Sequence, residues 1–122
     1  MKSILIVEDS TTTRSLIRAV IEELGDFNIV EAPTGFDALK LFPAQDFDLV
    51  VTDINMPDIT GLELINFVRS NQRYSNIPLI IVTTEKSEED KKRGMALGAT
   101  AYVTKPFKAS ELQDVVRKVL NL

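Results

Sequence analysis

Short apolar runs alternate along the chain with longer segments in which apolar residues recur at helical spacing. The runs are of strand length and predict five strands, at residues 3–7, 27–31, 48–53, 79–82 and 99–104. The clearest of these runs are apolar without interruption, which is typical of strands covered on both faces. The order of the elements therefore predicts an α/β fold, with a parallel sheet between two layers of helices.

Each of the five predicted helices begins at a side chain that can cap a helix. The caps are residues 10–13, Thr34, Thr60 with Glu63, Ser87, and Ser110 with Gln113. The first helix should bury an apolar stripe made of Leu16, Ile17, Val20, Ile21 and Leu24. The last should bury another, made of Leu112, Val115, Val116, Val119 and Leu120.

The fourth predicted helix differs from the others because residues 85–94 contain no apolar side chain. Only Met95, Ala96 and Leu97 could dock it against the sheet. We therefore expect this helix to be loosely held and to open at low free energy.

The composition limits the chemistry that this chain can perform. Its 122 residues are a length typical of one domain, and they include neither cysteine nor histidine, so disulfides, thiolate nucleophiles and Ser-His-Asp triads are excluded. The net charge of -4 argues against nucleic-acid binding, and the apolar runs are too short to span a membrane. We expect one cytoplasmic, monomeric domain over residues 1–122, with no output domain, no nucleic acid and no membrane contact.

Chemically versatile side chains stand at the carboxyl ends of four predicted strands. They are Glu8, Asp9, Asp53, Thr83 and Lys105. Parallel strands point the same way, so these side chains should meet at one edge of the sheet. Each of them alone has an ordinary structural explanation in a turn, a helix start or a strand. Their joint placement is what favours a functional site.

Three carboxylates at one edge repel one another unless a cation is present, and Mg²⁺ prefers such oxygen ligands. The hydroxyl of Thr83 and the ammonium of Lys105 add two donors of the kind that a phosphoryl group on an aspartate requires. The pattern predicts Mg²⁺-dependent phosphoryl transfer to Asp53. It also predicts that crowding raises the pKa of at least one of the carboxylates.

On these residues the chain resembles the receiver domains of bacterial two-component response regulators, most closely the single-domain chemotaxis type. The resemblance covers the whole chain, and its marks are residues 4–10, residues 53–57, Gly61, Thr83 and residues 105–107. It implies a flavodoxin-like, doubly wound sheet of five parallel strands in the order 2-1-3-4-5, flanked by five helices.

The resemblance also implies a function in phosphorelay signalling. Asp53 would accept phosphate from a histidine kinase or phosphotransfer protein, and Thr83 and Lys105 would contact the phosphoryl group. Mg²⁺ would be bound by Asp9, Asp53 and the backbone carbonyl of Asn55, with Glu8 helping through water. Such a protein is not an enzyme in the ordinary sense, since it catalyses only its own phosphorylation and dephosphorylation before binding a downstream target protein.

Switching is expected to depend on Thr83 and Tyr102, which in the family couple phosphorylation to a surface on the fourth helix, fifth strand and fifth helix. The Lys105–Pro106 peptide is expected to be cis, because Lys105 must turn back towards Asp53 directly after its strand.

Two positions depart from the commonest family pattern, and two alternative functions stay open. Glu8 stands where Asp is more usual, and Thr84 is bulkier than its usual counterpart, so Thr84, with Asn55 and Glu85, bears on access to the phosphoryl group. An aspartyl-phosphate hydrolase like the haloacid dehalogenases would carry a second Asp where Asn55 stands. A nucleotide-binding module would need a glycine-rich loop after the first strand, which is not seen.

Overall fold

A computed structural model describes residues 1–84 and 88–122 of the chain, and strands alternate with helices throughout these residues. In chain order they are β1 (Lys2–Val7), α1 (Thr11–Glu22), β2 (Phe27–Ala32), α2 (Gly35–Leu41), β3 (Leu49–Thr52), α3 (Gly61–Ser70), β4 (Leu79–Thr83), α4 (Glu88–Ala96), β5 (Ala101–Thr104) and α5 (Ala109–Leu120). The alternation confirms the predicted α/β class. The predicted cap of α4, Ser87, lies outside the described residues.

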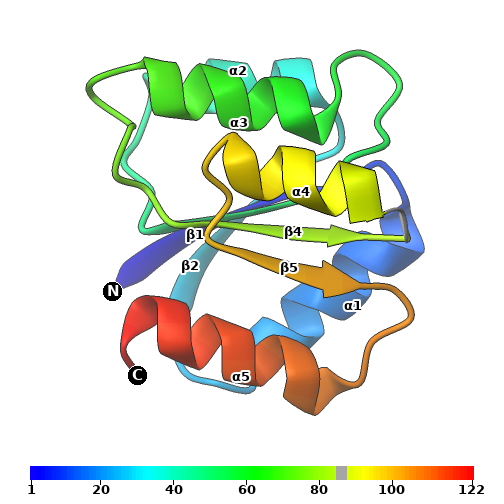
Figure 1. Ribbon diagram of the computed structural model, residues 1–122. Helices are drawn as coiled ribbons and strands as arrows, with labels where there is room; N and C mark the ends of the chain where they lie inside the picture. Colours follow the sequence, from blue (N-terminus) through cyan, green and yellow to red (C-terminus); the bar gives the residue numbers. More distant parts are fainter. Residues whose placement is uncertain (85–87) are drawn as a thin grey trace.

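The five strands form one parallel sheet in the order β2-β1-β3-β4-β5, as the resemblance implied. Figure 1 shows α2, α3 and α4 over one face of the sheet and α1 and α5 over the other. The central strand β3 is buried along its whole length. The residue that follows β3 therefore stands at the middle of the carboxyl edge, between residues that follow its two neighbours.

Each face of the sheet has its own apolar cluster. Leu5 and Val50 point into the cluster that includes the buried side chains of α2 and α3, whereas Ile4 and Val51 point into the one that includes those of α1 and α5. Neighbouring residues of one strand thus serve opposite clusters, because side chains alternate across a strand. This explains why the strand sequences are apolar without interruption.

Helix α1 buries a narrower apolar stripe than the sequence predicts. Ile17, Val20 and Ile21 are buried and Leu24 packs partly against them, but Leu16 is 52% exposed. The prediction that Leu16 belongs to the core is wrong. The other four residues lie at helical spacing and already cover the face towards the sheet, and Leu16 is rotated away from it.

Helix α4 makes even less apolar contact than predicted. Gly94 is the only buried residue within its described length, and a Cβ there would lie 2.6 Å from Cδ1 of Ile81. Met95 is 42% exposed and Ala96 is also exposed, so the prediction that they dock the helix is wrong. Leu97, just after the helix, packs against the core as predicted. The close approach of α4 to β4 uses the missing side chain of a glycine instead of an apolar stripe.

Helix α5 buries its predicted apolar face but begins earlier than predicted. Its N-cap is Lys108, and a carboxylate oxygen of Glu111 accepts a hydrogen bond from the Lys108 backbone N–H at 3.1 Å. Ser110 therefore lies inside the helix and is not its cap. Gln113 is not part of a capping box either, because its amide donates to the Val20 carbonyl of α1 at 3.0 Å.

Two other boundaries test the local predictions. The capping box of α3 is confirmed, with Glu63 N–H donating to the Thr60 hydroxyl at 3.1 Å and Thr60 N–H donating to the Glu63 carboxylate at 3.2 Å. Strand β5 starts at Ala101, two residues later than predicted, because the Ala99 N–H donates to the Gly94 carbonyl at the end of α4. No helix in the described part of the chain is long and apolar enough to cross a membrane.

Candidate functional site

Four of the five polar residues that the sequence places at the strand ends lie in one cluster, namely Glu8, Asp9, Asp53 and Lys105. Carboxylate oxygens of Glu8, Asp9 and Asp53 lie within 4.8 Å of one another at the carboxyl edge of the sheet. The Lys105 ammonium joins two of them, with Nζ 2.6 Å from a Glu8 oxygen and 2.9 Å from an Asp53 oxygen. The site is therefore a cluster of three acids and one cation contributed by three different strands.

Asp53 is held in place from both of its carboxylate oxygens. Oδ1 accepts hydrogen bonds from the backbone N–H groups of Ile54, at 2.6 Å, and Asn55, at 3.4 Å. Oδ2 accepts the bond from Lys105. The residue is only 7% exposed, and its own N–H donates to the carbonyl of Val7 on β1. A carboxylate fixed this way presents a defined oxygen to an incoming group.

Gly61 lets the loop after β3 close tightly over Asp53. A Cβ at this position would lie 2.0 Å from the backbone carbonyl oxygen of Asp53, which no side chain could tolerate. The Gly61 N–H also donates to the Ile54 carbonyl at 2.8 Å. The φ angle of Gly61 is not positive, so its backbone conformation does not require glycine. The glycine is needed here for the close approach of two backbone segments.

Burial dominates the electrostatics of Glu8, which is only 1% exposed. Burial raises the pKa of its carboxyl above the ordinary 4.5, and the Asp9 side chain adds a little, against hydrogen bonds from Lys105 and the Ser10 N–H. The predicted rise of a carboxylate pKa is confirmed in direction, but its main cause is desolvation by burial and not the repulsion that the sequence suggested. Because the folded state holds this proton more tightly, Glu8 costs stability as the pH rises from 4.5 through the raised pKa.

Lys105 responds to the same surroundings in the opposite sense. Burial alone would lower the pKa of its ammonium, but the hydrogen bonds and charges of Glu8 and Asp53 outweigh burial and raise the pKa above 10.5. The stabilisation from this ion pair is complete below 10.5 and is lost as the pH rises through the raised pKa. At neutral pH the site therefore contains a charged ammonium between two acids.

The donor set at this edge fits a hard divalent cation. All the candidate ligands are oxygens, since the chain has no histidine or cysteine, and three carboxylates offer the charge that Mg²⁺ requires. Lys105 occupies one oxygen of Glu8 and one of Asp53. The exposed side of the cluster is formed by Asp9.

The remaining predicted site residues that the structure describes differ in their exposure. Thr83 is fully buried at the end of β4, and its carbonyl accepts from the Lys105 N–H at 2.8 Å. Asn55 and Thr84 are exposed, and Tyr102 is half-buried on β5. Glu85 lies outside the described residues.

The turn after β5 directs Lys105 back to Asp53. The Lys105–Pro106 peptide is cis, which confirms the prediction. The predicted return of Lys105 towards Asp53 is also confirmed, because its ammonium reaches the Asp53 carboxylate.

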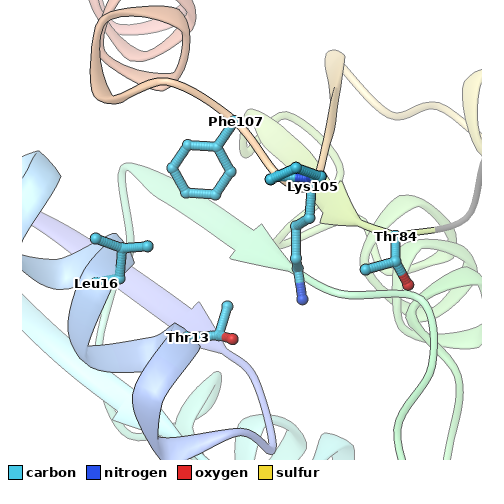
Figure 2. Close-up of a pocket in the computed structure, with 6 residues that line it drawn as sticks. Thr13, Leu16, Thr84, Lys105 and Phe107 are labelled. Carbon is cyan, nitrogen blue, oxygen red and sulfur yellow. The ribbon is translucent and has the colours of Figure 1, made fainter.

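A cavity of about 340 Å³ borders the site and was not predicted. It is lined by Thr13, Leu16, Thr84, Lys105, Pro106 and Phe107. Figure 2 shows Leu16 and Phe107 reaching into the same space from α1 and from the segment after β5. The available signal was Leu16 itself, a fifth apolar residue beside a stripe that four others already complete.

Comparison with known proteins assigns the chain to a family. Residues 4–117 match the response regulator receiver domain, so the chain belongs to that family. It is a signalling receiver of two-component systems and not a classical enzyme, and this role implies a kinase partner. Family membership decides against the hydrolase and nucleotide-binding alternatives.

Relatives and solved structures agree with this assignment. The chain is 37% identical over 118 residues to the chemotaxis protein CheY of Pseudomonas aeruginosa, covering 97% of this chain and 95% of that protein. It is similar to the structure of CheY4 of Vibrio cholerae, with a TM-score of 0.90, 34% identity and coverage of 98% and 99% of the two chains. It is also similar to the response regulator TrrA of Thermotoga maritima, solved in complex with Mg²⁺-BeF, with a TM-score of 0.86, 35% identity and coverage of 98% and 100%.

Proposed function

We propose that this receiver accepts a phosphoryl group on Asp53 from a histidine kinase or phosphotransfer protein. The observation that carries the proposal is the position of the Asp53 carboxylate, fixed between the Lys105 ammonium and the acidic pair of Glu8 and Asp9. Lys105 neutralises negative charge on the transferred group, and the buried hydroxyl of Thr83 supplies a second contact. The attacking oxygen belongs to a carboxylate that the backbone already orients.

A divalent cation is part of the proposed reaction. Bound Mg²⁺ supplies neutralisation of charge on the acceptor and on the phosphoryl oxygens. Asp9, Asp53 and the Asn55 carbonyl would hold it, with Glu8 acting through water, since Glu8 is buried and already paired with Lys105. The Mg²⁺-BeF complex of the TrrA relative supports this choice of ion.

The proposed output is a changed surface on α4, β5 and α5 that binds a target protein. Thr83 and Tyr102 would couple the acceptor to this surface, because Thr83 ends β4 and Tyr102 lies on the adjacent strand β5. The scarce apolar contacts of α4 lower the free-energy cost of a shift there. A relative that is named a chemotaxis protein makes chemotaxis one candidate pathway.

Incubation with acetyl phosphate and Mg²⁺, followed by intact-mass measurement, tests the acceptor assignment. The parent should gain one phosphoryl group, and Asp53→Asn should gain none. Asp46→Asn is a matched control, because Asp46 is highly exposed and precedes the amino end of β3, the end opposite to Asp53, and it should be modified like the parent. Stoichiometric modification of Asp53→Asn would show that another residue is the acceptor.

The lifetime of the phosphate gives a second readout of the same proposal. Asn55, two residues after the acceptor, is exposed, so water can reach the acyl phosphate. Loss of the phosphate should take minutes after the donor is removed. A phosphorylated form that persists for a day would contradict the proposed arrangement.

A further inference from the structure

Arg14 contacts the segment Glu8–Asp9 that follows β1. The phosphorylation chemistry described above makes no use of this contact. Arg14 lies in the first part of α1, and its guanidinium donates from Nη1 to the backbone carbonyl of Glu8 at 2.8 Å. The same guanidinium donates from Nε to the Glu31 carboxylate near the end of β2, also at 2.8 Å. Its side chain is only 16% exposed, so this bridge is largely shielded from solvent.

We propose that Arg14 is a positioning residue for the metal site, acting through the Glu8–Asp9 peptide. This inference rests on the proposed function, because it assumes that Asp9 helps to hold Mg²⁺. The Glu8 carbonyl belongs to the planar peptide that carries the Asp9 N–H. Fixing that carbonyl therefore fixes the plane from which Asp9 extends towards Asp53.

Other contacts fix Glu8 but not the peptide that follows it. The Glu8 carboxylate accepts from Lys105 and from the Ser10 N–H, and the Glu8 N–H donates to the Ala32 carbonyl. These bonds hold the side chain and the preceding peptide plane. The hydrogen bond to the Glu8 carbonyl comes from Arg14, which completes the constraint on the side facing Asp9.

The chain provides a matched control in Arg18, one turn further along α1. Arg18 also binds the Glu31 carboxylate, with Nη1 2.7 Å from Oε2. Within the described part of the chain its partners are Glu31 and Glu22, and it makes no hydrogen bond to the Glu8 carbonyl. Removing either arginine therefore removes an ion pair to Glu31, but only removal of Arg14 releases the Glu8–Asp9 peptide.

The expected effect is a loss of metal affinity with no loss of the chemical step. Partners that orient metal ligands from outside the ligand set typically contribute tenfold or more to affinity. We expect Arg14→Gln to raise the Mg²⁺ dissociation constant about tenfold, and Arg18→Gln to leave it within about twofold. Phosphorylation of Arg14→Gln should be slow at limiting Mg²⁺ and should return to the parent rate at saturating Mg²⁺.

Three metal-free proteins are titrated with MgCl₂, namely the parent, Arg14→Gln and Arg18→Gln. Isothermal titration calorimetry measures the binding, and the amide NMR signal of Asp9 monitors the peptide that Arg14 contacts. In the metal-free state the Asp9 signal should move or broaden in Arg14→Gln and stay near its parent position in Arg18→Gln. Arg14→Met retains the apolar part of the side chain and serves as the test variant if Arg14→Gln does not fold.

The outcomes separate this inference from the proposed function. A parent that binds no Mg²⁺ would refute the proposed metal site itself. A parent that binds Mg²⁺, together with Arg14 variants that bind it equally tightly, would overturn only the positioning role. Equal losses of affinity in Arg14→Gln and Arg18→Gln would also overturn it, because the effect would then come from the ion pairs with Glu31.

Discussion

Helices α1 and α4 lie on opposite faces of the same sheet and are held by different means (Figure 1). Helix α1 buries Ile17, Val20 and Ile21 and adds ion pairs to β2 through Arg14 and Arg18. Helix α4 buries only Gly94 within its described length. The ion pair between Asp90 and Arg93 is internal to the helix. Helix α1 is therefore anchored to the sheet by buried apolar side chains and ion pairs, whereas α4 packs against it mainly through a glycine.

The difference in anchoring between α1 and α4 matches the residues that precede each helix at the carboxyl edge of the sheet. The acidic pair that would contribute to the proposed metal site precedes α1, so the anchoring of α1 would hold these carboxylates in position before phosphorylation. Thr83 ends the strand that leads towards α4, where a shift costs little. A receiver needs both properties, because its acceptor must be rigid while its output surface must move.

The largest expected difference between α1 and α4 comes from removing one apolar side chain from each helix. Ile17→Ala should lower the free energy of unfolding by about 3 kcal/mol, because Ile17 is 2% exposed and its loss leaves a cavity. Met95→Ala, in α4, should change it by less than about 0.5 kcal/mol. Urea denaturation of both variants measures the contrast, and comparable losses would mean that α4 is anchored as firmly as α1.

Amide hydrogen exchange tests the same contrast without a mutation. Residues 88–93 of α4 should open at a free energy on the order of 2 kcal/mol below that of residues 17–21 of α1, because few buried contacts oppose opening there. Protection in α4 should also change when the protein is phosphorylated. Equal protection of the two helices, unaltered by phosphate, would count against a mobile output surface.

The ion pairs of α1 should make its fastening depend on pH. Hydrogen bonds from Arg18 and Arg14 lower the pKa of Glu31 below the ordinary 4.5, although burial opposes them. This stabilisation is present above 4.5 and is lost as the pH falls through the lowered pKa. Glu31→Gln should therefore cost about 1 kcal/mol at pH 7 and progressively less in acid.

A control for the Glu31 measurement is available on the same helix. Glu22 lies 3.6 Å from Arg18 and is more exposed than Glu31, so Glu22→Gln should cost no more than about 0.5 kcal/mol at any pH. The two variants are compared by thermal unfolding from pH 3 to pH 7. A loss in Glu31→Gln that does not shrink in acid would exclude the charged pair as its source.

The smallest effect is expected for Leu16, which lies at the edge of the buried apolar stripe of α1. Leu16→Ser should change the free energy of unfolding by less than about 0.5 kcal/mol, although Leu16 is next to Ile17 in sequence, because half of its side chain is exposed. A loss near that of Ile17→Ala would show that Leu16 is part of the core after all.

The sequence was sufficient for the features that depend on strand direction. Parallel strands bring Glu8, Asp53 and Lys105 to one edge whatever the details of packing, and the structure places them in contact. It was less informative where neighbouring elements compete for a side chain. Gln113 has the spacing of a capping residue, but it binds the end of α1 instead, and only the packed fold shows that α1 lies within its reach.

The prediction for α4 failed in part for a related reason. An apolar stripe is one way to dock a helix, so Met95 was expected to supply it. The structure instead brings backbone close to Ile81 at Gly94, a contact that has no apolar signature in the sequence. Arg14 is similar, because a cation four residues into a helix gives no sign that it will reach a backbone carbonyl of the preceding strand end.

In the apolar cluster on the α2 and α3 side of the sheet, four aromatic rings pack together, those of Phe42, Phe47, Phe67 and Tyr74. This arrangement has a practical consequence for optical spectroscopy. The chain contains two tyrosines and no tryptophan. Tyr74 is packed against Phe42, with ring centroids 5.2 Å apart, whereas Tyr102 is half-buried on β5. In a Tyr74→Phe variant the ultraviolet emission would come from Tyr102 alone. Such a variant would report the state of the proposed output surface without an attached dye.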